Sequence, residues 1–168
     1  DVEMSFIDKE DILGLIEGFI KRLFKEALGV DVATPFPRLT YKESMERYGS
    51  DKPDTRFDME ITDLSQEVKG CGFGVFTGAL ENGGKVAAIT AKNAFSVLTR
   101  KEVDKLTEYV RGIGAKGLAW ARIGEDGTIA SSFAKFMTED EMKAICLKCG
   151  AENGDVILIV ADKASTTL

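Results

Sequence analysis

Apolar residues at helical spacing mark the first part of the chain. They predict a helix over residues 8–28, with Asp8 capping its start and Gly29 ending it. Its apolar stripe is formed by Ile12, Ile16, Phe19, Leu23 and Ala27. A stripe of this kind normally faces a core, so we expect these side chains to be buried. Before the helix, residues 1–6 alternate polar and apolar side chains and predict a half-buried strand.

A short polar region over residues 36–56 separates two different patterns. Thr40 and Glu43 have the spacing of a capping box, which predicts a helix start. Gly49 can end that helix, and the following Ser-Asp-Lys-Pro-Asp is rich in turn-forming residues. We therefore expect a short helix followed by a tight polar turn.

From about residue 70 the pattern changes to short apolar runs separated by glycine-rich turns. The predicted order is strand, strand, helix, strand, strand, helix and strand, at residues 73–77, 85–90, 99–113, 118–123, near 129, 138–149 and 156–161. Residues 81–84, Glu-Asn-Gly-Gly, predict a hairpin between the first two strands. The expected fold class is α+β, with a two-layer domain of mostly antiparallel sheet and helices on one face.

Composition excludes several kinds of function. The 168 residues contain no histidine, which removes the usual catalytic base and the commonest metal ligand. Three cysteines are too few for a disulfide framework and favour a reducing compartment. A net charge of −6 argues against a broadly basic nucleic-acid-binding protein, so any RNA contact must be local. No apolar run approaches the roughly 20 residues of a membrane span, and we expect a cytoplasmic protein.

Two motifs with the appearance of chemical sites lack the right context. Residues 112–117 satisfy G-x-G-x-x-G, but the predicted helix precedes the motif and a strand follows, the reverse of a dinucleotide site. Cys146 and Cys149 have the spacing of a zinc or redox pair, yet only Cys71 remains as a further thiol ligand. We therefore expect no metal site and no thiol chemistry in this chain.

The polar region strongly resembles a segment that follows motif 2 in bacterial-type aspartyl-tRNA synthetases. The phrase that carries the resemblance is Leu-Thr-Tyr-x-Glu-x-x-x-Arg-Tyr-Gly-Ser-Asp-Lys-Pro-Asp-x-Arg, at residues 39–56. The second half resembles the insertion domain of the same synthetases, called GAD because subunits of tRNA-dependent amidotransferases share it. That likeness is carried by Phe-Gly-Val-Phe, Leu-Thr-Arg-Lys-Glu, Gly-Ala-Lys-Gly-Leu and Gly-Asp-Val-Ile-Leu, at residues 73–76, 98–102, 114–118 and 154–158.

The resemblance implies a fragment of a class II aminoacyl-tRNA synthetase. Residues 1–65 would be part of the catalytic domain, residues 66–162 the GAD domain, and residues 163–168 the return towards the catalytic domain. The chain also starts in mid-pattern without an initiator methionine, as expected of a piece. The full-length protein would be a homodimeric ligase that activates aspartate with ATP and Mg²⁺ and transfers it to tRNA. The fragment itself would have no catalytic residue and would bind no cofactor.

The resemblance also places two acidic residues near the substrate. Asp1 and Glu3 match the end of motif 2, whose strand lines the aminoacyl pocket, so they would border the aspartate pocket. An alternative is a noncatalytic tRNA-binding module with a GAD domain, as in the amidotransferase subunits. Those relatives should lack the motif 2 end and the phrase at residues 47–54, so the presence of both favours the synthetase.

One basic stretch is a candidate contact for tRNA. Residues 100–122 carry six cationic and three acidic side chains, against the acidic balance elsewhere. Within it we single out Arg100, Lys101 and Lys105 as possible phosphate contacts. A solvated helix face with paired charges is the alternative. We also expect the fragment to self-associate through the helix at residues 9–28, because its apolar stripe is too large to leave in water.

Overall fold

The computed structural model describes residues 2–167. The chain divides into two compact units, Asp1–Thr40 and Tyr41–Leu168, which we call the N-terminal and C-terminal units. The N-terminal unit contains one helix, α1 (Lys9–Leu28). As predicted, Asp8 caps α1 by accepting hydrogen bonds from the backbone N–H groups of Glu10 and Asp11, and Asp11 completes a capping box. Gly29 ends the helix with a left-handed φ of 69°.

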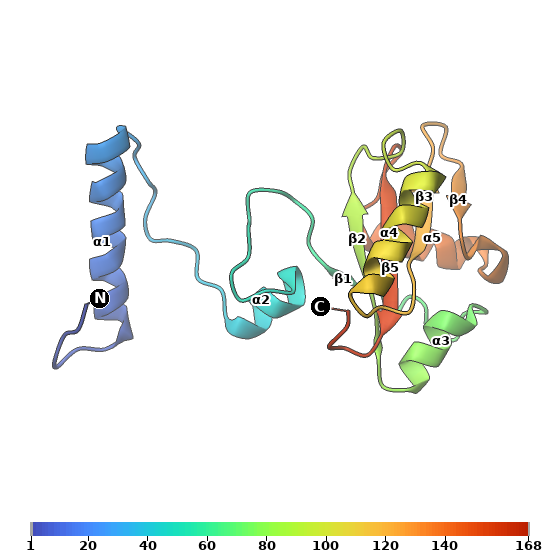
Figure 1. Cartoon of the computed structure of the whole chain (residues 1–168), viewed down its shortest axis with the longest axis horizontal. Helices are drawn as coiled ribbons and strands as arrows, with labels where there is room; N and C mark the ends of the chain where they lie inside the picture. The colour runs from blue at the N-terminus through green and yellow to red at the C-terminus, as the bar shows by residue number, and fades with distance from the viewer. Residues whose placement is uncertain (1, 168) are drawn as a thin grey trace. The chain divides into compact units, whose positions relative to one another are not determined.

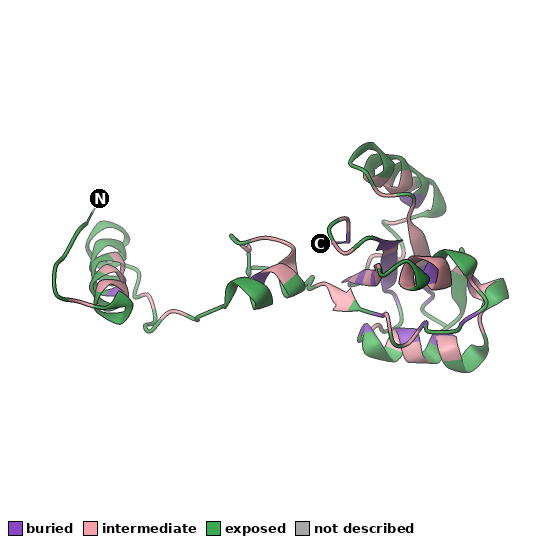
Figure 2. Ribbon diagram, turned by 90° about the horizontal axis from the view of Figure 1, so that it is seen from below, coloured by how far each residue is buried: buried purple, intermediate pink, exposed green. Residues whose placement is uncertain are grey.

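Two expectations for the N-terminal unit are wrong. Residues 2–6 form no strand, since the unit offers no second strand to pair with and Phe6 has a positive φ of 60°. The apolar stripe of α1 is not a core face either. Phe19 is 59% exposed and Leu23 is 45% exposed, and Glu17 is the buried residue of the helix. Figure 2 shows α1 largely in the colour of exposed residues. Ile12 and Ile16 are half-buried, but among the described residues of the unit no second helix or strand covers the rest of the stripe.

The C-terminal unit begins with a short helix and then builds a sheet with further helices (Figure 1). Its elements are α2 (Tyr41–Tyr48), β1 (Thr62–Asp63), α3 (Gly74–Glu81), β2 (Lys85–Ala91), α4 (Arg100–Gly112), β3 (Ala119–Ile123), β4 (Ile129–Ser131), the 3₁₀ turn η1 (Ala134–Phe136), α5 (Glu139–Lys148) and β5 (Val156–Asp162). The sheet has the order β1-β2-β5-β3-β4. Every neighbouring pair is antiparallel, which confirms the α+β class and the expected sheet type.

β5 lies at the centre of the sheet and is apolar on both faces. Ile157 and Ile159 pack into the main core, which α3 and α5 complete with Phe76 and Ile145. Val156 and Leu158, whose side chains alternate with these, form a second cluster with Val103 of α4 and other residues. The helices therefore cover both faces of the sheet, whereas the sequence predicted helices on one face. The unbroken apolar run of β5 is typical of a strand covered on both sides.

Residues 73–77 are the clearest secondary-structure error. The sequence predicts a strand and a hairpin there, but the residues from Gly74 onward form α3. The Glu-Asn-Gly-Gly sequence ends that helix instead, with Gly83 at a φ of 71° and the N–H of Gly84 bonded to the carbonyl of Ala79. Thr138 and Glu141 form a capping box at the start of α5, whereas Thr99 makes no side-chain cap at the start of α4.

Candidate functional site

The acidic pair expected at the substrate pocket is only partly described. Asp1 lies outside the described residues. Glu3 is exposed and belongs to no strand. Residues 2–6 form no strand, and the placement of Asp1 and Glu3 at the border of the aspartate pocket stays a prediction.

The three cations singled out for tRNA lie in the first turns of α4. Arg100, Lys101 and Lys105 are all exposed. The Nζ of Lys105 lies 2.7 Å from a carboxylate oxygen of Glu102, so that charge is paired. Within residues 2–167, Arg100 and Lys101 have no ion pair. They lie at the positive end of the α4 dipole, so positive potential is concentrated there.

The other cations of the basic stretch do not extend this surface. Arg111 pairs with Glu108 at 2.8 Å, and Lys116 lies 3.5 Å from the carboxylate of Asp162. Arg122 has a structural role: its guanidinium lies 4.2 Å above the ring of Phe95 and donates a 2.6 Å hydrogen bond to the Phe95 carbonyl. The paired-charge alternative thus describes most of the stretch, and two free cations remain as a candidate phosphate contact.

The phrase at residues 47–54 forms a closed local structure with neighbouring residues. Glu60 accepts a 2.8 Å hydrogen bond from Nε of Arg47 and a 3.2 Å bond from the hydroxyl of Tyr48. These contacts raise the pKa of Arg47 further and lower the pKa of Glu60. The hydroxyl of Ser44 donates to the carbonyl of Ser50 at 2.7 Å and closes the turn onto α2. The phrase therefore joins α2 to the start of the sheet.

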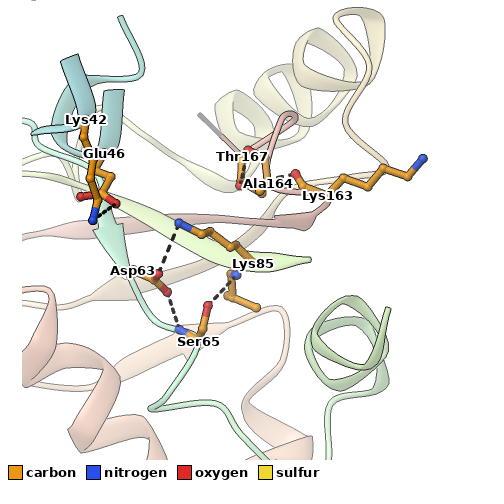
Figure 3. Close-up of polar contacts among 9 residues, drawn as sticks. Lys42, Glu46, Asp63, Ser65, Lys85, Lys163, Ala164 and Thr167 are labelled. Carbon is orange, nitrogen blue, oxygen red and sulfur yellow. Dashed lines mark hydrogen bonds and ion pairs between the residues drawn. The ribbon is translucent and has the colours of Figure 1, made fainter. Parts of the chain in front are cut away.

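Polar contacts also connect β1 to β2 at the edge of the sheet, as Figure 3 shows. The carboxylate of Asp63 accepts the backbone N–H of Ser65 at 2.9 Å and lies 3.9 Å from the ammonium of Lys85. The hydroxyl of Ser65 in turn accepts the N–H of Val86 at 3.2 Å. These residues secure β1 on β2, and their interactions are all internal to the fold.

The cysteine pair lies at the end of α5. Burial raises the pKa of Cys149 to about 11 and also raises the pKa of Cys146. Both are therefore protonated thiols at neutral pH, which disfavours nucleophilic or metal-binding behaviour. Among residues 2–167, no group of three or more histidine, cysteine, aspartate or glutamate side chains is arranged to hold a metal ion. No described helix is long and apolar enough to cross a membrane.

Sequence reasoning missed Glu17, the one buried charge of α1. Its carboxylate lies 2.8 Å from the guanidinium of Arg38 and accepts the backbone N–H of Phe36 at 3.1 Å. This contact ties the chain after α1 back onto the helix. The sequence feature that could have indicated its burial is the position of this glutamate next to Ile16 of the predicted apolar stripe.

The antiparallel sheet and its helices form a small α+β domain. The sequence profile of the GAD domain matches residues 76–168, and the chain belongs to the GAD domain family. The chain is 54% identical over 97% of its length to aspartate–tRNA ligase of Agathobacter rectalis. It is 53% identical over 98% of its length to aspartate–tRNA(Asp/Asn) ligase of Bacillus cytotoxicus, and 53% identical over its whole length to aspartate–tRNA ligase of Clostridium perfringens. The chain spans 27–28% of the length of these relatives.

Proposed function

We propose that the chain is a segment of an aspartate–tRNA ligase and contributes no catalytic residue of its own. The observation that carries the proposal is the extent of the similarity. The GAD profile begins at residue 76, but the identity to the ligases covers 97–100% of the chain, including the N-terminal unit. A free-standing GAD module would not need the residues before the domain, so the similarity favours the synthetase over the amidotransferase alternative.

The whole protein would join aspartate to the 3′ end of tRNA after activating it with ATP and Mg²⁺. Because this chain spans only 27–28% of the length of the ligases, we assign the ATP and Mg²⁺ site to other parts of the whole protein. The proposal includes a homodimeric, cytoplasmic full-length enzyme.

Within the segment, we propose the division given by the resemblance. Residues 1–65 would belong to the catalytic domain, residues 66–162 to the GAD domain and residues 163–168 to the return. Asp1 and Glu3 would border the aspartate pocket, where carboxylates suit a substrate ammonium group. Self-association through α1 also stays a prediction, and its exposed Phe19 and Leu23 supply the apolar surface that it requires.

A chimeric enzyme tests the proposed function. The 168 residues of this chain would replace the matching segment of the Clostridium perfringens ligase, to which they are 53% identical over their whole length. We expect the chimera to retain aspartate-dependent ATP–pyrophosphate exchange and tRNA aspartylation within about tenfold of the parent, since the inserted segment matches the parent over its whole length.

The matched control replaces only residues 1–40 of the inserted segment with a flexible glycine-serine linker. That control should lose exchange, because it lacks the part assigned to the catalytic domain. A folded, dimeric chimera without any aspartylation would contradict the proposal.

A second experiment tests the proposed tRNA contact. Arg100, Lys101 and Lys105 would be changed together to glutamate in the full-length protein. Because phosphate contacts depend on salt, we expect tRNA affinity to fall by about tenfold or more at low salt and by less at high salt. Aspartate activation should be unchanged. Filter binding at several salt concentrations measures the effect.

The control for this experiment changes Lys135 and Lys143 to glutamate. These lysines also belong to the C-terminal unit but lie outside α4. Its tRNA affinity should stay close to that of the unmodified protein. Equal losses in both variants would show a general effect of net charge and would remove the α4 contact.

A further inference from the structure

A cleft of about 750 Å³ opens in the C-terminal unit where β5 extends beyond β3. α3 forms one wall and residues 116–119 form part of the other. Ile159 and Ala161 of β5 lie between these walls. A cleft of this size is in the range of ligand-binding sites.

The edge of β5 inside the cleft has free backbone groups. β3 pairs with β5 only as far as Ala119 opposite Ile159, so residues 160–162 of β5 have no partner on that side. On the other side, Val86 faces Ala161, but its N–H and C=O are bonded to Ser65 and Leu64, away from β5. At such a non-hydrogen-bonded position of an antiparallel pair, the backbone N–H and C=O groups of the two opposite residues point away from each other.

The N–H and C=O of Ala161 therefore point towards the side where β3 begins only at Ala119 and residues 116–118 are not part of the strand. Among residues 2–167, β3 supplies no ladder partner for Ala161, and no backbone hydrogen bond from outside the sheet reaches it. Ala161 lines the cleft and is only 9% exposed, so this part of β5 lies inside the cleft and not on an open surface. Buried backbone groups are almost always paired, and one more extended segment would pair both of them.

The α3 wall leaves room for such a segment. Gly74 and Gly78 both line the cleft, and a Cβ added at either one would meet no atom within 4 Å. A ligand backbone can therefore approach the helix closely. Val75 of α3 also lines the cleft and is 54% exposed, so an apolar side chain is available to an extended ligand.

The rim of the cleft is cationic. Arg111, Lys116 and Lys163 line it, against the single carboxylate of Asp162. Lys116 is paired with that carboxylate at 3.5 Å and Arg111 with Glu108. The ammonium of Lys163 has no ion pair among the described residues, and Figure 3 shows its side chain extended without a drawn contact. This charge is complementary to an acidic ligand.

We propose that the cleft binds a short, extended acidic peptide of a partner protein, which adds to β5 as a strand. Two main-chain hydrogen bonds to Ala161 would fix its register, and the cationic rim, with Lys163 as its free charge, would select acidic side chains. The site lies wholly within the C-terminal unit and does not depend on the proposed ligase function.

The test uses the isotopically labelled 168-residue chain and a capped pentapeptide of alternating valine and glutamate. We expect NMR titration to move the amide signal of Ala161 and the peptide to slow its hydrogen exchange. Gly78→Leu should weaken binding by about tenfold, because its side chain fills the cleft while suiting a helix. The matched control Gly112→Leu, also at an open helix position but outside the cleft, should bind within about twofold of the unmodified chain.

Two further comparisons separate main-chain pairing from charge. A peptide with N-methylated backbone should fail to bind, and a peptide with lysine in place of glutamate should bind about tenfold more weakly. Lys163→Glu, which leaves the walls intact, should weaken the acidic peptide alone. Unchanged binding of the N-methylated peptide, or no shift at Ala161, would overturn the proposal. Protection of Ala161 in the full-length protein without peptide would overturn the partner assignment, since the protein's own chain would then fill the cleft.

Discussion

Phe133→Ala is expected to lower the free energy of unfolding of the C-terminal unit by about 3–5 kcal/mol. Phe133 is fully buried between β4 and η1. Its ring lies 5.2 Å from the ring of Phe76 and 5.8 Å from that of Phe73, between centroids. Truncation would leave a cavity at the junction of α3 with the sheet and remove these aromatic contacts as well.

Urea unfolding followed by the fluorescence of Trp120 measures this loss, since the indole is on β3 of the same unit. The matched control is Phe136→Ala. Phe136 stacks on Phe73 at 5.4 Å but is 42% exposed, so its loss should cost only about 1 kcal/mol. Similar losses for the two variants would contradict the assignment of Phe133 to the core.

Local signals in the sequence predicted most elements of the C-terminal unit. The run at residues 85–90 is long enough and sufficiently β-branched to favour a strand, and Thr138 with Glu141 specifies a helix start through contacts three residues apart. Residues 73–77 gave the wrong result because a short apolar run has no period that separates a strand from a buried helix turn. The helical conformation there goes with the packing of Phe76 against Phe133, a residue that is distant in sequence.

The candidate sites depended on still more distant contacts. A charge count predicted the basic stretch, but it could not reveal that Arg122 stacks on Phe95 or that Lys116 pairs with Asp162. The cleft beside Ala161 was equally hidden, because it depends on where pairing between β3 and β5 stops. Motif resemblance identified the family because it does not require those contacts to be known.

A buried carboxylate of the C-terminal unit, Asp155, was also missed. It is 2% exposed and lies directly before β5. Its two oxygens accept the backbone N–H groups of Asn93 and Glu152, both at 2.8 Å, and one lies 2.9 Å from the ammonium of Lys92. One side chain thus joins the loop that follows β2 to the loop that precedes β5. The sequence showed only a Gly-Asp pair before a strand.

The pKa of Asp155 reflects opposing effects. Burial is the largest effect and favours the neutral acid, but the N–H groups of Glu152 and Asn93 and the charge of Lys92 together outweigh it. The pKa in the folded state is therefore below its ordinary value of 3.8. A carboxylate with a lowered pKa stabilises the fold above the unfolded-state pKa, and this contribution is lost as the pH falls through the folded-state pKa.

We therefore expect Asp155→Ala to lower the free energy of unfolding by about 2–4 kcal/mol at neutral pH, because two buried N–H groups lose a charged acceptor. Asp155→Asn, which keeps one acceptor oxygen, should lose less. Asp104→Ala, at an exposed carboxylate of α4, should change the free energy of unfolding by less than about 0.5 kcal/mol.

Urea unfolding from pH 7 to pH 3 provides the decisive comparison. The difference between the unmodified chain and Asp155→Ala should be constant down to about pH 5. It should shrink below about pH 4, where Asp155 takes up a proton more readily in the unfolded chain than in the folded one. A difference that stays the same through this range would mean that the side chain stabilises the loops by packing, without its charge.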